Sequence, residues 1–466
     1  MRVGVIGAGP AGLTAAYRLA SVGVDVSIFE AGPHVGGMAR SFDLWDHRVD
    51  LGPHRFFSKD QRVNALWHEL IGEDFRLVER QTRIFFRGRY FDYPLRIGNV
   101  IANLAFRDVA RSLVGYAVEQ LSSERPADRR LSFEDWAVHS FGRPLFEMFF
   151  RSYSEKLWGI SCAELDRDFA AQRIRRFSLG QSILAALGIG RDNHKTLVEI
   201  FAYPKRGSGE VYDRMIKAIG KAGGRVLLET PIVGISVVNG AVSGVRTAAG
   251  AFHACEHIVS TMPLTLLVQG LGDVPAPVAE AVARLRFRNT ILVYLKIEAE
   301  DLFPDQWLYI HSDGVKVGRV TNFNNWLPEL CEESSATVLA LEYWCYDGDA
   351  IWDASHSELI TLAEQELRSI GLLGSARVAD GHVERLRRCY PVYSRGYRDS
   401  LAPVVEHLRT IGNLWPIGRY GAFKYNNQDH SILMGLLAAE NIAGGKSHDL
   451  WAINSDYDSY QEDGEV

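Results

Sequence analysis

The apolar positions of the first forty residues are grouped in an order that predicts a strand, a tight turn, a helix and a second strand. Residues 2–6 form a short apolar run typical of a strand, and residues 13–20 place apolar side chains on one helical face. A further apolar run over residues 24–29 predicts another strand, which ends in Glu30. A glycine-rich turn indicates a chemical function only when it lies between a strand and a helix of this kind.

The turn between the first strand and the helix is the segment Gly7-Ala8-Gly9-Pro10-Ala11-Gly12. Gly7 permits the tight turn, Gly9 lets the backbone approach a pyrophosphate, and Gly12 allows the helix to pack close to the strand. The positive end of the helix faces the anion. Glu30 is placed to accept hydrogen bonds from the ribose hydroxyls of an adenosine. The segment therefore predicts a dinucleotide-binding turn.

A second glycine-rich segment, Gly36-Gly37-Met38-Ala39-Arg40, follows shortly after Glu30. A glycine pair lets the chain pass close to a cofactor, and Arg40 could reach a second phosphate. The alternatives are NAD in place of FAD and a glycine turn without a ligand; the added glycine pair favours FAD. The extension resembles the FAD-binding amine oxidase and protoporphyrinogen oxidase superfamily more than the plain NAD dehydrogenases.

The middle of the chain begins with a pattern of helical spacing. Residues 97–121 predict a helix with one apolar stripe, for which packing inside a helical domain is favoured over a membrane surface. Ser132 and Asp135 have the spacing of a capping box at the start of the next helix. Residues 144–156 and 166–186 continue the helical pattern. The polar loop 188–195 is equally compatible with a lid and with a plain surface loop.

The pattern changes at residues 203–209, after which short apolar runs typical of strands predominate. Strands are predicted over residues 225–229, 232–238, 242–247, 251–255, 290–297, 317–323, 336–344 and 417–423, with hairpin turns at Gly88 and at Asn239-Gly240. Helices are predicted over residues 211–222, 358–370 and 432–443. The N-terminus of the last helix is expected beside the cofactor, where its partial positive charge favours an anionic reduced flavin.

The order of these elements predicts an α/β fold with three parts. A discontinuous Rossmann-like FAD-binding domain is predicted over residues 1–60, 203–265 and 401–466. A helical domain over residues 97–202 and a mixed substrate-side β-sheet over residues 61–96 and 266–400 complete the chain. A length of 466 residues is sufficient for two or three domains.

Composition and charge narrow the class of protein. Apolar residues make up 47% and charged residues 23%, which is typical of a globular protein, and the net charge of −6 gives no sign of nucleic-acid binding. The five scattered cysteines lack metal-ligand spacing and predict reduced thiols and no metal site. No apolar run approaches the roughly 20 residues of a membrane span. We therefore expect a soluble, cytoplasmic protein, and a homo-oligomer is compatible with the sequence.

Eleven short motifs, spread over nearly the whole chain, resemble the UDP-galactopyranose mutase family, more its longer eukaryotic type than its short bacterial type. The motifs are Gly7 to Gly12, Gly36-Gly37, Gly52-x-His54-x-x-Phe57, Tyr93-Pro94, Phe133-x-Asp135-Trp136, Lys156-x-Trp158, Arg206-Gly207, Ser260-Thr261-Met262, Trp307-Leu308-Tyr309, Gly418-Arg419 and Asn427-Gln428-Asp429-His430-Ser431. Their order makes them specific for the family and less specific for the substrate.

The resemblance implies a flavin-dependent isomerase that interconverts the pyranose and furanose forms of a nucleotide sugar. The FAD of this family must be reduced, so that its N5 can attack the anomeric carbon and displace the diphosphate, and NADPH is the implied reductant. The family connects the chain with galactofuranose and cell-surface polysaccharide biosynthesis. The alternatives are an oxidase or desaturase of the protoporphyrinogen oxidase type and a non-catalytic FAD-binding protein.

The resemblance also implies roles for individual residues. Arg173 and Arg319 match the two arginines that clamp the diphosphate, and His54 matches a histidine whose backbone lies near flavin N5. The implied substrate-binding residues are Tyr93, Arg96, Phe149, Ser154, Trp307, Tyr309, Tyr397, Tyr425 and Asn427. The implied cofactor-binding residues are Gly7, Gly9, Pro10, Ala11, Gly12, Glu30, Ala31, Gly36, Gly37, Met38, Ala39, Arg40, Gly52, Pro53, His54, Val233, Thr261, Met262, Gly418, Arg419, Asn427, Gln428, Asp429 and Ser431.

Two departures from the family pattern bear on the substrate, and a third on the flavin-facing loop. Arg96 stands where the family's uracil pocket has a glutamine, and Ser154 aligns with an expected asparagine. Phe149, which would stack on the base, is retained. Because amide hydrogen bonds discriminate between bases whereas stacking does not, a base other than uracil or a sugar other than galactose is predicted. Pro53 replaces a glycine in the flavin-facing loop.

Overall fold

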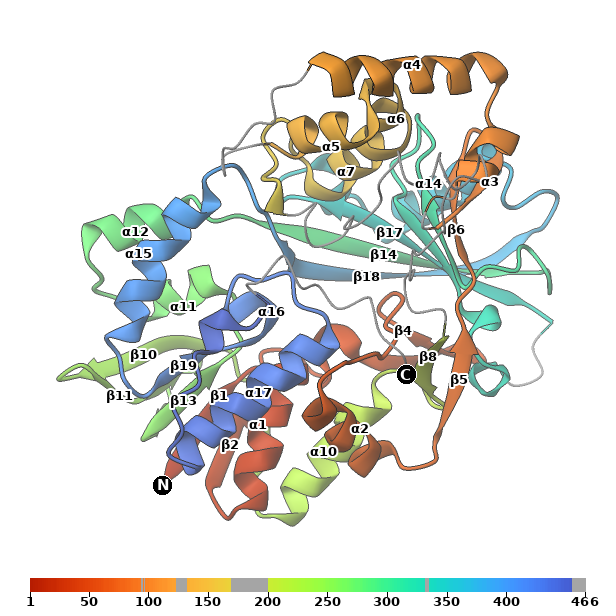
Figure 1. Cartoon of the computed structure of the whole chain (residues 1–466). Coiled ribbons are helices and arrows are strands. Elements are labelled where there is room, and N and C mark those ends of the chain that lie inside the picture. The colour runs from red at the N-terminus through yellow and green to blue at the C-terminus, as the bar shows by residue number, and fades with distance from the viewer. Residues whose placement is uncertain (94, 96, 123–131, 169–199, 332–334, 455–466) are drawn as a thin grey trace.

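A computed structural model describes the chain except for residues 94, 96, 123–131, 169–199, 332–334 and 455–466 (Figure 1). The predicted loop 188–195 and the two arginines Arg96 and Arg173 lie outside the described residues, as does most of the predicted helix over residues 166–186. The described residues form parallel and antiparallel sheets with helices on their faces, and the predicted α/β class is confirmed.

The N-terminal apolar run forms the centre of a five-stranded parallel sheet with the order β19-β13-β1-β2-β9. Its strands are β1 (Arg2–Ile6), β2 (Asp25–Phe29), β9 (Arg225–Leu227), β13 (His257–Ser260) and β19 (Leu414–Pro416). Three distant parts of the chain therefore meet in one sheet. The dinucleotide turn follows the central strand.

Alternate side chains of this sheet pack on two different layers. Val5 and Ile28 share a core with helices, whereas Phe29 and Ile258 share a core with a three-stranded antiparallel sheet. The helices are α1 (Pro10–Ser21), α2 (Gln61–Ile71), α10 (Glu210–Lys221) and α17 (Gln428–Ala443). The antiparallel strands are β10 (Ile232–Val238), β11 (Ala241–Thr247) and β12 (Phe252–Ala254), with the predicted turn at Asn239-Gly240. The sheet is thus the middle of three layers, as the period of two predicts.

A seven-stranded mixed sheet with the order β18-β14-β17-β16-β15-β6-β7 forms the upper half of Figure 1. Its strands are β6 (Thr82–Phe86), β7 (Arg89–Asp92), β14 (Phe287–Ile297), β15 (Trp307–Ile310), β16 (Arg319–Asn322), β17 (Thr337–Cys345) and β18 (Val378–Pro391). One face, with Val293, packs on α13 (Ala350–Asp353) and α14 (His356–Ser369). The opposite face, with Tyr294 and Trp307, belongs to the core that surrounds the cavity described below.

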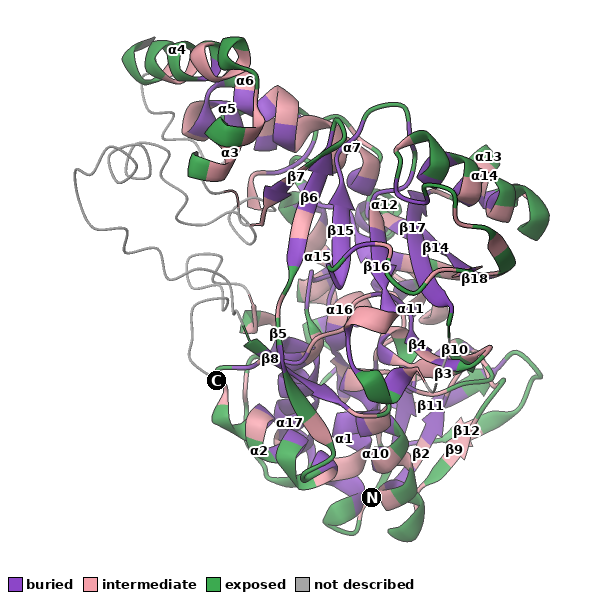
Figure 2. Cartoon of the chain, turned by 90° about the vertical axis from the view of Figure 1, so that its right-hand side faces the viewer, coloured by how far each residue is buried: buried purple, intermediate pink, exposed green. Residues whose placement is uncertain are grey.

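A cluster of helices lies at one end of the molecule, around α4 in Figure 1. Its members are α3 (Ile97–Asn103), α4 (Phe106–Ser122), α5 (Phe133–Phe141), α6 (Arg143–Leu145), a π-helical turn (Phe146–Arg151) and α7 (Ser152–Trp158). The capping box of Ser132 and Asp135 is confirmed. The single helix predicted over residues 97–121 is instead two helices, and its apolar stripe is largely exposed: Val114 is 63% and Leu121 88% exposed (Figure 2).

Several remaining elements differ from the sequence expectation. Residues 417–423 are not a strand, because β19 ends at Pro416 and a helical turn, α16 (Gly418–Gly421), follows. The strand β18 and the helix α15 (Tyr397–Arg409), which contains Pro403, were not predicted. The other elements are β3 (Ser41–Leu44), β4 (His47–Asp50), β5 (Phe75–Glu79), β8 (Ile200–Pro204), α11 (Leu264–Gly270) and α12 (Ala276–Ala283).

Two further expectations bear on the whole chain. All five cysteines are free thiols. Among the described residues, no helix combines the length and the apolar character needed to cross a bilayer. The division into three domains stays a prediction, although the two large sheets draw their strands from different parts of the sequence.

Candidate cofactor and substrate cavity

The dinucleotide turn has the close contacts that require glycine. Gly7 has a φ of +96°, and a Cβ there would overlap the hydroxyl of Thr261. A Cβ at Gly12 would overlap the carbonyl oxygen of Gly7. Gly9 is the N-cap of α1 and Pro10 its first residue, so no side chain caps the helix and its first N–H groups face the cavity.

Glu30 directly follows β2 and lines the cavity beside Phe29 and Ala31. Its carboxylate accepts hydrogen bonds from the backbone N–H groups of Ala8 at 2.7 Å and Gly32 at 2.9 Å. These bonds fix the carboxylate at the end of the turn. Each oxygen keeps a lone pair with which to accept a ribose hydroxyl, in accordance with the predicted role.

The second glycine segment packs directly on the turn. A Cβ at Gly37 would lie 3.0 Å from the Cα of Gly9, and Met38 and Ala39 line the cavity. Arg40 does not line it, contrary to expectation. Its guanidinium instead pairs with the carboxylate of Glu384 on β18 at 2.8 Å, which draws the side chain away from the turn.

One cavity of about 510 Å³ joins the turn to the seven-stranded sheet. The first turn of α17 enters it with Gln428 and Asp429, and Asn427 caps this helix together with His430. Burial raises the pKa of Asp429 above its usual value. Other predicted cofactor residues that line the cavity are Gly7, Gly9, Pro10, Ala11, Gly37, Pro53, His54, Thr261, Met262, Gly418 and Ser431.

Arg419 places a buried positive charge in this cavity. Its Nε donates to the carbonyl of Cys389 at 2.9 Å and its Nη1 to that of Asn426 at 3.0 Å. The guanidinium lies over the rings of Tyr425 and Tyr390, 4.2 and 4.6 Å from their centroids. Its Nη2 is buried and has no hydrogen-bond partner among the described residues, so an oxygen of a bound group could satisfy it.

These observations fit a flavin dinucleotide. The chain supplies a close-packed glycine turn at a helix N-terminus, an acidic residue for a ribose, a second helix N-terminus and an unsatisfied buried donor in one cavity. Anionic groups are stabilised at such helix ends. Gly7, Gly9 and α1 would hold the pyrophosphate, Glu30 the adenosine ribose, and Arg419 with α17 the flavin.

The far wall of the cavity is aromatic and comes from the seven-stranded sheet. Trp307 and Tyr309 project from β15, and the ring of Tyr309 lies 4.7 Å from that of Tyr93. Arg80 also lines the wall and donates to the carbonyl of Tyr93 at 3.1 Å. The Nε1 of Trp307 is buried without a hydrogen-bond partner in the described part of the chain. This wall offers stacking surfaces and donors to a ligand.

Arg319 lines the same cavity but already has a carboxylate partner. Its Nε and Nη2 donate to the two oxygens of Glu342 on β17, at 2.5 and 2.6 Å. Burial lowers the pKa of Arg319, but the facing Glu342 carboxylate outweighs it and holds that pKa well above its usual value. The pair as a whole therefore brings no net charge to the cavity, and only Nη1 is left outside this fork.

His54 enters the cavity as a neutral imidazole. Burial, with the charges of Arg319 and Arg419, lowers its pKa to about 4, and its ring nitrogen lies 3.0 Å from the carbonyl of Leu51. Gly52 precedes it with a φ of +96°, and a Cβ there would come within 3.1 Å of Glu342. The loop is thus closely packed against the ion pair.

Several predicted residues lie outside the cavity. Phe149 packs on Phe86 and Phe91, and Ser154 is buried in α7. Tyr397 stacks on Tyr393, with ring centroids 4.3 Å apart, and donates to Asp168.

Four further residues that were predicted to bind the cofactor also do not line the cavity. Val233 is 56% exposed, and its neighbour Ile232 lines the cavity in its place, because adjacent strand residues face opposite sides. Gly12, Gly36 and Gly52 do not line the cavity, although their sequence neighbours Ala11, Gly37 and Pro53 do.

Other residues that line the cavity were not predicted to be site residues, among them Arg55, Phe57, Arg80, Tyr390, Asn426 and His430. Arg55 and Phe57 lie within the motif Gly52-x-His54-x-x-Phe57, of which only Gly52, Pro53 and His54 were predicted to contact the cofactor. Tyr390 ends the unpredicted strand β18, so no element placed it.

Comparisons with known proteins identify the family of the chain. A model of the flavin containing amine oxidoreductases matches residues 10–442. A probable UDP-galactopyranose mutase of Klebsiella pneumoniae is 28% identical over 46% of this chain; the match spans about half, 52%, of that relative.

Solved structures share the fold. A crystal structure of reduced UDP-galactopyranose mutase has a TM-score of 0.86 at 22% identity, over 98% of this chain and 99% of its own. A putrescine oxidase variant has a TM-score of 0.64 at 17% identity, over 96% and 99% of the two chains. The family model spans most of the sequence, and its cofactor is the one that the cavity fits. The chain belongs to the flavin containing amine oxidoreductase family.

Proposed function

We propose that the protein is a flavin-dependent mutase of nucleotide sugars that works with reduced FAD. The observation that carries this proposal is the composition of the wall opposite the dinucleotide turn. Trp307, Tyr309, Tyr93 and Tyr425 line it together with Arg319, which suits a sugar diphosphate better than an apolar substrate. The similarity to UDP-galactopyranose mutases in sequence and fold supports the same assignment.

In this proposal the protein positions the substrate, and bound reduced FAD would supply the nucleophile for the anomeric carbon. Arg319 would offer Nη1 to a phosphate oxygen while Glu342 holds the rest of its guanidinium in place. The buried Tyr390 keeps its proton, since burial and the neighbouring Tyr425 raise its pKa, and would donate to the diphosphate. The neutral ring of His54 adds no charge to the cavity.

The base and the sugar belong to the same proposal. Arg96 and Arg173 lie outside the described residues, and Ser154 and Phe149 do not line the cavity. Trp307 and Arg80 offer donors on the aromatic wall instead. Uracil recognition through two amides is therefore unsupported, and a base other than uracil remains our expectation. NADPH as reductant is proposed on the family resemblance alone, and a cytoplasmic location on the scattered free cysteines of the sequence.

An oxidase or desaturase acting on an apolar substrate is the second candidate. The neutralised Arg319–Glu342 pair favours it, because a paired guanidinium attracts a diphosphate less strongly than a free one. Apolar residues such as Met262, Pro263 and Leu266 also line the cavity.

Product analysis under reducing conditions separates the two candidates. The flavin-loaded protein is reduced with dithionite and offered UDP-, TDP- and GDP-hexopyranoses, and furanose formation is followed by NMR. Conversion that requires reduction supports the mutase and identifies the base. Oxygen consumption with an apolar substrate, without furanose formation, would establish the second candidate.

A matched pair of variants tests the role of Arg319. Arg319→Lys should lower kcat/KM by about 10²-fold, because a lysine cannot reproduce the fork with Glu342 and also face the ligand. Arg83 on β6 forms the same two-bond fork with Asp305 outside the cavity, so Arg83→Lys should leave kcat/KM within a few-fold of wild type.

A further inference from the structure

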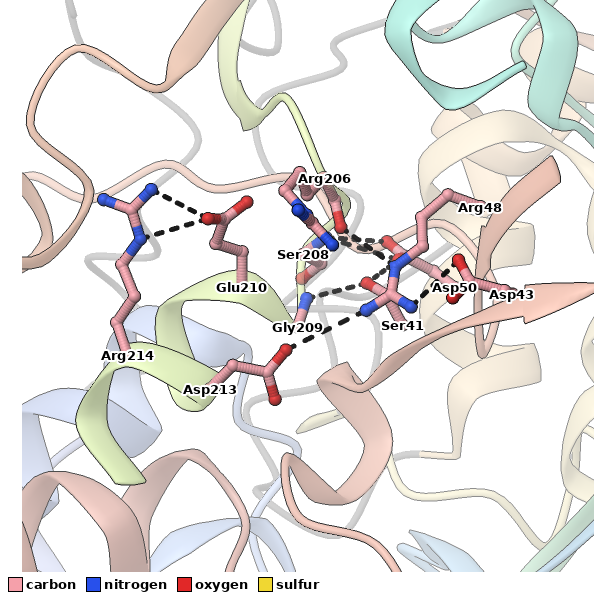
Figure 3. Close-up of polar contacts among 10 residues, drawn as sticks. All are labelled: Ser41, Asp43, Arg48, Asp50, Arg206, Ser208, Gly209, Glu210, Asp213 and Arg214. Atoms are coloured by element: carbon pink, nitrogen blue, oxygen red, sulfur yellow. Dashed lines mark hydrogen bonds and ion pairs between the residues drawn. The ribbon is translucent and has the colours of Figure 1, made fainter. Parts of the chain in front are cut away.

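A fully buried carboxyl group lies behind the cavity, at the end of β4. The side chain of Asp50 accepts hydrogen bonds from the hydroxyl of Ser41 and from the backbone N–H of Ser208 at 3.3 Å (Figure 3). It also accepts a hydrogen bond from the hydroxyl of Tyr203 at 2.7 Å. Ser41 in turn accepts from the N–H of Gly209 at 2.8 Å. The carboxyl thus joins the β3–β4 hairpin to residues 203–209, the segment at which the sequence pattern changes.

Two glycines make this contact possible. A Cβ at Gly207, whose φ is +85°, would overlap Ser41 and approach Asp50 to 3.0 Å. A Cβ at Gly209 would overlap the backbone nitrogen of Ser41. The sequence Arg206-Gly207-Ser208-Gly209 is therefore shaped to fit the hairpin, and this gives the segment a role that the cofactor contacts do not explain.

The network reaches the cavity along three short routes. Ser41 lies two residues after Ala39 and Asp50 three residues before Pro53, and both Ala39 and Pro53 line the cavity. The third route is a chain of hydrogen bonds: the hydroxyl of Ser208 accepts from the amide of Gln428 at 3.1 Å, and Gln428 lines the cavity at the start of α17.

Gln428 is also held from its other side. Its amide oxygen accepts from the hydroxyl of Tyr212 at 2.7 Å. The orientation of this amide is therefore set by Ser208 and Tyr212 together. A change at the Asp50 end of the network would be transmitted to Gln428 through Ser208.

Ionisation reverses hydrogen bonds in this network. An ionised Asp50 can accept from Ser41, Tyr203 and Ser208 at once, whereas a protonated Asp50 must donate one bond, which requires Ser41 or Tyr203 to turn its hydroxyl. Burial raises the pKa of Asp50 to about 7, although the three hydrogen bonds and the charge of Arg48 lower it. Both states are therefore accessible near neutral pH.

We propose that Asp50 is a positioning residue for the bound flavin, which it controls through Ser41, Ser208 and Gln428 according to whether its carboxyl carries a proton. This inference rests on the flavin of the proposed function and not on the mutase reaction. A buried negative charge close to a flavin disfavours the anionic reduced form. Ionised Asp50 should therefore lower the reduction potential of the flavin.

The two tyrosines and the histidine packed near Asp50 have pKa values away from neutral pH in the folded protein. Burial and Asp50 itself hold the pKa of Tyr203 well above its usual value, and burial holds that of Tyr294 well above it too. The pKa of His54 is lowered to about 4. The other groups that face the network from β3, β4, α10 and the facing segment are Asp43, Arg48, Asp213 and Arg206 (Figure 3).

The test is the reduction potential of the flavin-loaded protein, without a sugar, measured from about pH 5.5 to about pH 8.5. The wild type should show a break in the plot of potential against pH near pH 7. Asp50→Asn mimics the protonated carboxyl, so its potential should agree with the wild type at the acid end, lie above it at the alkaline end and show no break.

Three further variants sharpen the result. Asp43→Asn removes an exposed carboxylate from the same hairpin and should keep the break. Ser208→Ala keeps the backbone bond to Asp50 but loses the link to Gln428, so the break should be smaller. Ser41→Ala removes a bond to the ionised carboxylate and should move the break to higher pH, a result available even if Asp50→Asn does not fold.

A break that persists unchanged in Asp50→Asn overturns the inference, and so does a full-sized break in Ser208→Ala. A protein that shows the expected breaks but isomerises no sugar nucleotide keeps the inference and loses the mutase. A protein that binds no flavin overturns both.

Discussion

Arg319 and Glu342 are the residues whose pairing most affects the chemistry of the cavity. The side chain of Glu342 is 3% exposed and that of Arg319 16% exposed, and two hydrogen bonds join them across β16 and β17. An ion pair of this kind gains little over an apolar pair, but removal of one partner leaves a buried charge uncompensated. The pair therefore fixes the orientation of the Arg319 guanidinium, but the carboxylate of Glu342 neutralises the charge of that guanidinium.

Glu342→Gln should lower the free energy of unfolding by about 3–5 kcal/mol, because Arg319 would keep its charge in a buried position without a counter-charge. Urea denaturation measures the change. The matched control is Glu298→Gln, which breaks the exposed pair with Arg377 and should leave the midpoint unchanged. Equal shifts in the two variants would contradict the structural assignment of the buried pair.

At the residue scale, the sequence could place backbone-determined positions but not side-chain directions. Gly7, Gly9 and Glu30 have roles that follow from a strand–turn–helix order, and the structure places them at one end of the cavity. The roles of Tyr397 and Phe149 rest on the residue type at positions outside the eleven matched motifs. Their rings instead pack on Tyr393 and on Phe86, which no local pattern specifies.

At the scale of elements, the crossing of α1 and α17 carries the cofactor turn. Gly435 of α17 lies at the point of closest approach, where a Cβ would come within 2.5 Å of the carbonyl oxygen of Ala11 and 2.8 Å of Thr14. Both helices begin at the cavity, so their separation sets the distance between its two helix N-termini.

Gly435→Ala should lower the free energy of unfolding by about 1–3 kcal/mol and weaken flavin retention, because the added methyl group forces the two helices apart. Thermal unfolding and the ratio of flavin to protein absorbance after gel filtration measure the two effects. Gly220 of α10 has open space around its Cβ position. Gly220→Ala should therefore stabilise the protein by about 0.4–1 kcal/mol and leave the flavin content unchanged.

Strands in the middle of a sheet, which are buried on both faces, were predicted more accurately than exposed or edge elements. The central strands β1, β2 and β14 have clear apolar runs. Strand β18 lies at the edge of its sheet, and its many charged side chains hide the period of two. The helix α15 was missed because it contains Pro403, which ordinarily ends a helix.

At the scale of the whole molecule, buried titratable groups make stability depend on pH in opposing directions. Burial lowers the pKa of His311 to about 3 and that of His54 to about 4. The unfolded chain binds protons at these residues first as the pH falls, so they destabilise the fold in acid. Burial raises the pKa of Asp50, so this residue acts in the opposite sense. Through it, the free energy of unfolding falls as the pH rises toward 7.

His311→Gln isolates one of these contributions. The free energy of unfolding of the wild type should fall by about 1.4 kcal/mol per pH unit more steeply than that of the variant, as the pH decreases from 6.5 toward 3. Urea denaturation over this range measures the slope. His356→Gln, which removes an exposed imidazole at the start of α14, should keep the wild-type slope.

The position of β19 in the parallel sheet has a consequence for biosynthesis. Strand β1 leaves the ribosome first, but its sheet is complete only when residues 414–416 pair with β13. At a synthesis rate of about 5–20 residues per second, roughly 20–80 s pass between the synthesis of the cofactor turn and that of β19. From its own synthesis until residue 414 is made, roughly 8–30 s at the same rate, β13 is an unpaired edge, open to strands of other chains. Nascent chains that stall before residue 414 should therefore be the species that aggregates and that chaperones retain.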